Sequence, residues 1–141
     1  MVVALLIGIL LAVGSWYFAR ITGLEKNRSF YPTVIICIAV FYVFFAAHAS
    51  TAMLREVVIA SLFSAAALVS AFRWRWLIVA ALVLHGAYDI LHPALFSTPV
   101  APSWWAPFCA GYDLLLALLV AYALHQNNPA IDKDQSISGR S

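Results

Sequence analysis

The chain has 141 residues, of which 65% are hydrophobic and 10% are charged, and its formal net charge is +2. Soluble domains carry about 25% charged residues, so this composition excludes an ordinary water-soluble domain and indicates the lipid bilayer as the solvent. A net charge this small argues against nucleic acid as a partner, and the two cysteines, Cys37 and Cys109, lack the spacing of a zinc site.

Five apolar runs are each near the length of about 20 residues that a helix needs to cross the hydrocarbon core. The predicted spans cover residues 1–19, 30–47, 51–72, 76–92 and 104–124. Pro32 fits the first turn of the second span, where its missing N–H costs nothing. The segment AAHASTAMLRE after the second span reads as a turn, and Pro93 is expected to end the fourth span.

The first run is predicted to stay in the protein as a helix. No basic residue precedes it, and Arg20 follows it, which is the reverse of the order in a cleaved signal peptide. Residues 1–126 therefore form one transmembrane domain. Residues 127–141 are polar and are expected to form a disordered cytoplasmic tail.

The basic residues predict the orientation of the chain. Five spans place the first loop, the third loop and the tail on one side, with Arg20, Lys26, Arg28, Arg73, Arg75, Lys133 and Arg140. The other side has only Arg55. Because cytoplasmic loops are rich in Lys and Arg, we expect an all-α, polytopic membrane protein with its N-terminus outside and its C-terminus in the cytoplasm. A multi-pass protein of a bacterial inner membrane fits this pattern.

The polar stretch HGAYDILHP, residues 85–93, interrupts the fourth span. His85, Asp89 and His92 are spaced i, i+4 and i+7, so they share one helix face. At ~1.5 Å per residue, His85 lies about 15 Å into the span, near the middle of the bilayer. Asp113 is predicted at a similar depth in the last span, and Glu56 at the outer end of the third. These five residues are expected to converge in the outer half of the bundle.

The two aspartates resist a purely structural interpretation more strongly than the other polar residues do. A carboxylate at the centre of a membrane helix costs roughly 2.5–3.5 kcal/mol even on a lenient insertion scale, and such residues face the bundle interior with partners. A structural hydrogen-bond cluster with neutral carboxyls stays open as an interpretation. By contrast, His48 and His125 are expected at the interfaces, and the tryptophans are expected to form interfacial belts.

A divalent metal site is the chemistry that this pattern predicts. His85, Asp89 and His92 supply nitrogen and oxygen ligands from one face, which suit zinc or iron. Asp113 is a further ligand or the general base, and Glu56 a second candidate for proton transfer. With an open position for water on the metal, such a site fits a hydrolase or related enzyme that acts on a lipid-like, apolar substrate.

Three other functions remain open from the sequence. The stripe of His85, Asp89 and His92 also fits a proton or ion relay, such as a small transporter subunit that forms a homo-oligomer. An acid–base isomerase or cyclase of an isoprenoid lipid would use Asp113, Asp89 and Glu56. A haem-binding membrane protein would use His85 as an axial ligand.

The segments LHGAYDILHP and PFCAGYD, with a glutamate near the start of the preceding span, resemble a family of small bacterial integral membrane proteins. That family is catalogued only as a domain of unknown function. The positions that match its pattern are Glu56, His85, Asp89, His92, Cys109 and Asp113. The resemblance covers about residues 40–125 and implies that these side chains act as a unit in a bacterial inner membrane. Members carry a second histidine where this chain has Pro93, so a ligand role at that position does not carry over.

A weaker analogy is to membrane zinc hydrolases of the alkaline ceramidase type, which also place histidines and an aspartate inside a helical bundle. Those proteins have seven spans and a different histidine spacing, so the likeness concerns the chemistry of the site alone.

Overall fold

The computed structural model describes residues 1–50, 52–96 and 100–126. Five long helices and one short 3₁₀ helix account for the regular structure in these ranges. Their bounds are α1 (Val2–Thr22), η1 (Leu24–Lys26), α2 (Phe30–Ala49), α3 (Met53–Phe72), α4 (Trp76–Leu95) and α5 (Trp105–Gln126). Each of the five long helices is long and apolar enough to cross a membrane. The prediction of an all-α chain with five such helices is therefore confirmed, while the predicted tail, 127–141, lies outside the described residues.

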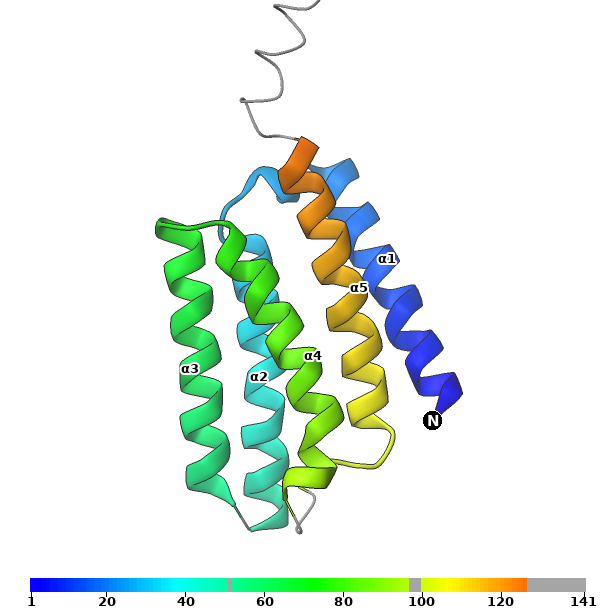
Figure 1. Cartoon of the computed structure of the whole chain (residues 1–141), viewed down its shortest axis with the longest axis vertical. Helices are drawn as coiled ribbons and strands as arrows, with labels where there is room; N and C mark the ends of the chain where they lie inside the picture. Colours follow the sequence, from blue (N-terminus) through cyan, green and yellow to red (C-terminus); the bar gives the residue numbers. More distant parts are fainter. Residues whose placement is uncertain (51, 97–99, 127–141) are drawn as a thin grey trace, which may run out of the picture.

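The helices run alternately up and down, so the connections between them fall at two opposite ends of the bundle (Figure 1). α1 packs along α5, α5 along α4, and α2 along α3. One end holds the α1–α2 and α3–α4 connections and the last turn of α5. The other end holds the N-terminus and the α2–α3 and α4–α5 connections (Figure 1).

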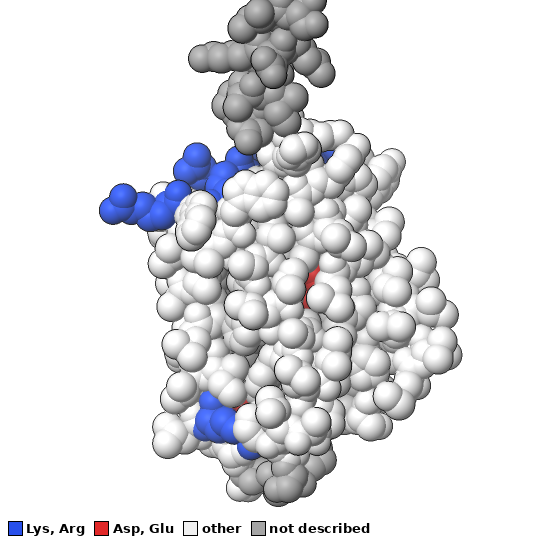
Figure 2. All heavy atoms as spheres, viewed as in Figure 1, with Lys and Arg blue, Asp and Glu red and all other residues white. Residues whose placement is uncertain are grey.

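Basic residues gather at the ends of the face shown in Figure 2, and between them only a small acidic patch is visible through the apolar surface. The end with the α1–α2 and α3–α4 connections carries Arg20, Lys26, Arg28, Arg73 and Arg75. The opposite end carries Arg55, near the start of α3. We call the first of these the basic end. Since apolar side chains such as those of Leu10, Phe44 and Leu118 are exposed along the helices, the surface between the two ends matches a hydrocarbon environment.

The predicted end of the fourth helix was wrong. Pro93 does not end α4, which continues to Leu95. Pro93 lies in the last turn, so the N–H that it lacks removes only one bond of the helix, the one to the carbonyl of Asp89. In the AAHASTAMLRE segment, α2 ends at Ala49 and α3 begins at Met53, each two residues beyond the predicted ends at 47 and 51. The change of direction is thus confined to the few residues between these helices.

The interior has two apolar clusters with polar side chains between them. The cluster nearer the basic end includes Ile35, Leu82 and Leu116, and the other includes Tyr42 and Trp105. Trp105 was expected to lie in an interfacial belt, but it is buried against Phe41, Phe45 and Phe108. Trp104, which is half exposed, keeps the position expected of a belt residue. The position of Trp105 is therefore set by its packing against aromatic rings, and not by the preference of tryptophan for the membrane interface.

Two glycines allow α1 and α5 to pack closely. A Cβ atom added to Gly8 would collide with the carbonyl oxygen of Phe108 on α5. A Cβ atom added to Gly111 on α5 would lie 2.7 Å from the carbonyl oxygen of Leu5. Small residues at such crossings are typical of membrane helix pairs, because they let the backbones approach.

We predict that Gly8→Ala weakens the attachment of α1 to α5. Gly14→Ala is the matched control, because no atom lies within 4 Å of a Cβ added to Gly14, also on α1. The two variants share the gain in helix propensity, so the difference between their unfolding free energies reports the clash, which should cost about 1–3 kcal/mol. Thermal unfolding in detergent measures it, and equal stability of the two variants would contradict the described α1–α5 crossing.

Candidate functional site

The polar residues of α4 and α5 are buried at the level where the two apolar clusters meet. His85, Asp89 and His92 on α4 and Asp113 on α5 are each at most 3% exposed. His85 stands near the middle of the 20-residue helix α4. Apolar residues lie on either side of them, so each of these side chains needs a polar partner inside the bundle, which is the condition for retaining charged groups in a membrane helix.

Three of these residues form one group, which we call the aspartate–histidine cluster: His85, Asp89 and Asp113. Nδ1 of His85 lies 2.7 Å from Oδ2 of Asp113 and 3.3 Å from Oδ2 of Asp89. One ligand atom from each residue can be chosen so that all three lie within 4.8 Å of one another. The cluster thus joins two helices, with the imidazole between the two carboxylates.

A tyrosine from α2 completes the surroundings of the cluster. The hydroxyl of Tyr42 donates a hydrogen bond of 2.6 Å to Oδ1 of Asp89. Among the described residues, Oδ1 of Asp113 and Oδ2 of Asp89 accept no hydrogen bond although both atoms are buried, and Oδ2 of Asp89 has only the 3.3 Å contact with Nδ1 of His85. Leaving a buried charged oxygen unsatisfied is costly, so these two oxygens are available for a cation or a proton.

Close packing of α4 on α5 brings His85 and Asp113 together. A Cβ atom added to Gly86 would lie 3.1 Å from Cγ of Leu114 and 3.4 Å from Cβ of Asp113. Glycine at position 86 therefore favours the close approach of the two helices beside the His85–Asp113 pair, because a larger side chain there would require Leu114 to shift. Gly86 was not identified by the sequence analysis.

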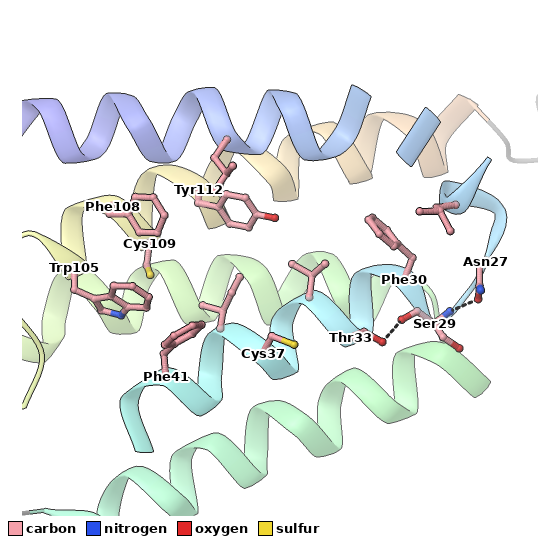
Figure 3. Close-up of a pocket in the computed structure, with 14 residues that line it drawn as sticks. Asn27, Ser29, Phe30, Thr33, Cys37, Phe41, Trp105, Phe108, Cys109 and Tyr112 are labelled. Atoms are coloured by element: carbon pink, nitrogen blue, oxygen red, sulfur yellow. Dashed lines mark hydrogen bonds between the residues drawn. The ribbon is translucent and has the colours of Figure 1, made fainter. Parts of the chain in front are cut away.

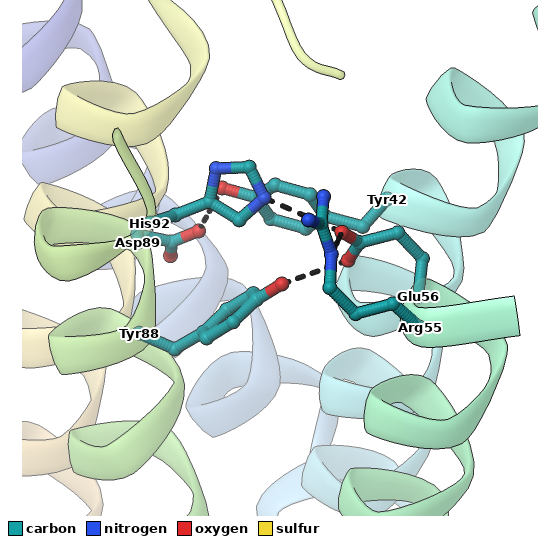
Figure 4. Close-up of polar contacts among 6 residues, drawn as sticks. All are labelled: Tyr42, Arg55, Glu56, Tyr88, Asp89 and His92. Atoms are coloured by element: carbon teal, nitrogen blue, oxygen red, sulfur yellow. Dashed lines mark hydrogen bonds and ion pairs between the residues drawn. The ribbon is translucent and has the colours of Figure 1, made fainter. Parts of the chain in front are cut away.

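A second polar group lies toward the end of the bundle opposite the basic end (Figure 4). We call it the glutamate cluster: Arg55, Glu56, Tyr88 and His92. Glu56 is fully buried; its Oε1 accepts a 2.8 Å hydrogen bond from Nε of Arg55, and its Oε2 accepts one of 2.7 Å from Tyr88. Nε2 of His92 lies 3.4 Å from Oε1 of Glu56. The Arg55 guanidinium also covers the ring of Phe96 at 3.7 Å, so this cluster contains its own cation.

The structure divides the five residues that were expected to converge. His85, Asp89 and Asp113 come together, whereas His92 pairs with Glu56 in the other cluster. Two aromatic contacts link the clusters, because the Tyr42 ring lies 5.0 Å from that of His92 and 5.4 Å from that of Tyr88. Tyr42 was missed because nothing in the apolar sequence of α2 distinguishes a tyrosine that reaches a carboxylate from one that packs.

The other candidates lie outside both clusters. His48 is exposed in the last turn of α2 and stacks near Phe44, and His125 is exposed in the last turn of α5. Cys109, one turn before Asp113, is buried, and Cys37 is exposed. The two histidines lie in the last turns of their helices, in agreement with the interfacial positions expected of them.

The charge balance separates the two clusters chemically. The glutamate cluster pairs one carboxylate with one guanidinium. The aspartate–histidine cluster has two carboxylates and one imidazole, and among the described residues no lysine or arginine forms an ion pair with either aspartate. Even with a charged imidazole, one negative charge would remain in an apolar setting. The cluster can therefore take up either a cation or a proton.

Comparison of the chain with protein-family models, with curated proteins and with solved structures finds no match. Relatives therefore contribute nothing to the interpretation, which depends on the geometry of the two clusters.

Proposed function

We propose that the aspartate–histidine cluster binds one divalent cation, with His85, Asp89 and Asp113 as the protein ligands. The observation that carries the proposal is that three buried ligand atoms, one from each residue, lie within 4.8 Å of one another. Among the described residues, the two carboxylates pair with the imidazole of His85 and with no lysine or arginine. A nitrogen and two oxygens form a donor set that suits zinc or iron. Asp113 thus serves as a ligand rather than as a free base, and His92 is not a ligand.

We further propose that the cation makes this protein a membrane enzyme, a metal-dependent hydrolase or a related enzyme of a lipid-like substrate. A bound divalent cation would supply Lewis-acid activation. The chain's own residues would position it: Tyr42 orients Asp89 through a 2.6 Å hydrogen bond, and Gly86 allows His85 to reach Asp113. Glu56 is the other buried carboxylate available for proton transfer, beside Tyr88.

A proton relay is the second candidate, favoured by the near-continuous series of polar groups between the two clusters. From Glu56 the series passes His92, Tyr42 and Asp89, and it ends at the His85–Asp113 pair. Tyrosine, histidine and carboxylate side chains can all exchange protons. In this proposal the excess negative charge of the aspartate–histidine cluster is neutralised by a proton rather than by a metal ion.

For the orientation, we propose that the basic end faces the cytoplasm and that the N-terminus lies outside. The support is the charge distribution, with Arg20, Lys26, Arg28, Arg73 and Arg75 at one end against Arg55 at the other. A bacterial inner membrane is the setting that we propose, because the excess of basic residues at one end follows the pattern of cytoplasmic loops. With this orientation, the glutamate cluster lies in the outer half.

We predict that the purified protein binds about one equivalent of zinc or iron with its three cluster residues as ligands. Asp113→Asn and His85→Ala should each reduce the bound metal at least tenfold, because each removes one ligand. His92→Ala should retain the metal, because His92 lies with Glu56. The measurement is metal content by mass spectrometry after dialysis against each metal.

His125→Ala is the control for an unspecific loss of bound metal, because His125 is an exposed residue at the end of α5. Size-exclusion profiles and helical circular dichroism identify any variant that fails to fold. A wild-type protein without metal after loading would reject the metal site. Loss of metal in His92→Ala with retention in Asp113→Asn would reject the ligand set.

We predict, for the relay alternative, that liposomes containing the protein dissipate a pH gradient and that Asp89→Asn abolishes this flux. Tyr42→Phe should reduce it, because the substitution removes the hydroxyl that contacts Asp89. Tyr122→Phe, on the exposed surface of α5, is the matched control and should leave the flux unchanged. Flux no greater than in empty liposomes would exclude the relay.

We predict that a cysteine at position 26 is labelled from the cytoplasmic side and one at position 50 from the outside. Lys26→Cys and Ser50→Cys are made in a Cys37→Ser, Cys109→Ser background, since both target residues are exposed at opposite ends of the bundle. A membrane-impermeant maleimide applied to intact and inverted vesicles gives the result. The reverse pattern would show that the proposed orientation is wrong.

A further inference from the structure

An apolar groove runs along α2 on the side that faces α1 and α5 (Figure 3). Its volume is about 620 Å³, within the range of small-molecule sites. Cys37 and Phe41 line it from α2, and Phe108, Cys109 and Tyr112 line it from α5. None of the residues of the aspartate–histidine cluster lines this groove, so it is a separate feature of the bundle.

The groove has the shape of a binding site for a hydrocarbon chain. Its α2 wall extends from Ser29 to Phe41, which is about 18 Å at a rise of ~1.5 Å per residue. One leaflet of the hydrocarbon core is about 15 Å thick, half of ~30 Å. Aromatic rings gather at the far end, where Trp105 lies 5.1 Å from Phe41 and 5.6 Å from Phe108. A single chain from the leaflet at the basic end would therefore fill the groove.

The other end of the groove is polar. Asn27, Ser29 and Thr33 line it there, joined by local hydrogen bonds of 2.8–2.9 Å (Figure 3). Lys26 and Arg28 flank Asn27, are exposed, and form no ion pair among the described residues. The hydrocarbon-lined groove thus opens beside basic side chains that have no acidic partner.

A smaller recess adjoins this polar end and contains an unpartnered donor. Asn27 lines both spaces, and Arg28, Arg75 and Tyr31 line the recess. Tyr31 is only 8% exposed, and its hydroxyl has no hydrogen-bond partner among the described residues. The recess measures about 40 Å³, enough for a group the size of a water molecule, such as an oxygen of a phosphate.

One acidic residue also lines this recess. The carboxylate of Glu25 lies 3.7 Å from Nε of Arg20, so it has a basic partner of its own. Because Arg20 balances the charge of Glu25, the charges of Arg28 and Arg75 give the recess a net positive charge. An anionic lipid headgroup therefore matches the charge of the recess better than a zwitterionic headgroup, because the cationic part of the latter would be repelled by the two arginines.

We propose that the groove binds one anionic phospholipid from the leaflet at the basic end. One acyl chain lies along α2 between α1 and α5, and the phosphate lies at the recess with Arg28, Arg75 and the Tyr31 hydroxyl. The proposal goes beyond the proposed function and does not depend on a bound metal. It assigns a ligand to a cavity that neither polar cluster uses.

Photoreactive phospholipids in reconstituted vesicles test the proposal. The full-length protein is labelled with phosphatidylglycerol carrying a diazirine near the end of one acyl chain, and in parallel with phosphatidylcholine carrying the same chain. We expect phosphatidylglycerol to label residues 33–41 and 105–112, and unlabelled phosphatidylglycerol to compete. Each arginine near the headgroup should favour the anionic lipid by about fivefold.

Two pairs of variants locate the chain and the phosphate. Val34→Trp fills the groove and should reduce labelling, whereas Ile59→Trp alters the shallow apolar hollow on α3 and α4 and should not. Arg28→Gln should reduce the preference for phosphatidylglycerol about fivefold. Arg73→Gln, a basic residue at the same end that does not line the recess, is its control and should leave the preference unchanged.

Three outcomes would overturn the proposal. The first is equal labelling of the groove by phosphatidylglycerol and phosphatidylcholine. The second is labelling spread evenly over the groove and the α3–α4 face, as expected of lipid that merely surrounds the protein. The third is protection of the groove by a second copy of the chain, which would appear as dimers whose formation Val34→Trp prevents. Metal content, measured on the same samples, is independent of all three.

Discussion

The pairing of His85 with Asp113 is the interaction on which the arrangement of the bundle depends. It joins α4 to α5 by a contact of 2.7 Å between fully buried polar atoms. A carboxylate at mid-membrane depth costs roughly 2.5–3.5 kcal/mol, and removing one partner of a buried pair leaves an uncompensated charge. Helices α4 and α5 therefore have to pack side by side, and Gly86 gives them the space to do so. In turn, α5 presents Gly111 to α1.

The two polar clusters differ in how far neighbouring side chains balance the charges of their carboxylates. Glu56 has a guanidinium, a phenol and an imidazole around its two oxygens, so its charge is balanced by neighbours. The aspartate–histidine cluster has two carboxylates, of which two oxygens lack a donor within the described parts of the chain. Because a low-dielectric interior amplifies any unbalanced charge, the aspartate–histidine cluster has the stronger requirement for a compensating cation or proton. Tyr42 lies between them and contacts both.

The sequence predicts the helices and part of the candidate site, for reasons that particular residues make clear. Hydropathy places five apolar helices, and the i, i+4 spacing puts His85 and Asp89 on one face. The same rule puts His92 on that face, further along the helix, but it does not say which neighbouring helix His92 meets there. Two turns of rise, about 10 Å, carry it to Glu56 on α3 instead. Tyr42, Gly86 and the burial of Trp105 come from contacts between helices, which no periodicity within one helix encodes.

The groove follows from the way α1 is attached. Gly8 and Gly111 bring the backbones of α1 and α5 together, so α1 lies against α5 and meets α2 chiefly through η1. The polar pairs, meanwhile, hold α2 toward α3 and α4, because Tyr42 reaches Asp89 on α4. Between these two sets of contacts, long side chains alone bridge α2 to α5, and a space of about 620 Å³ remains. A bundle that satisfies its buried carboxylates and its glycine crossing thus leaves an opening that hydrocarbon has to fill.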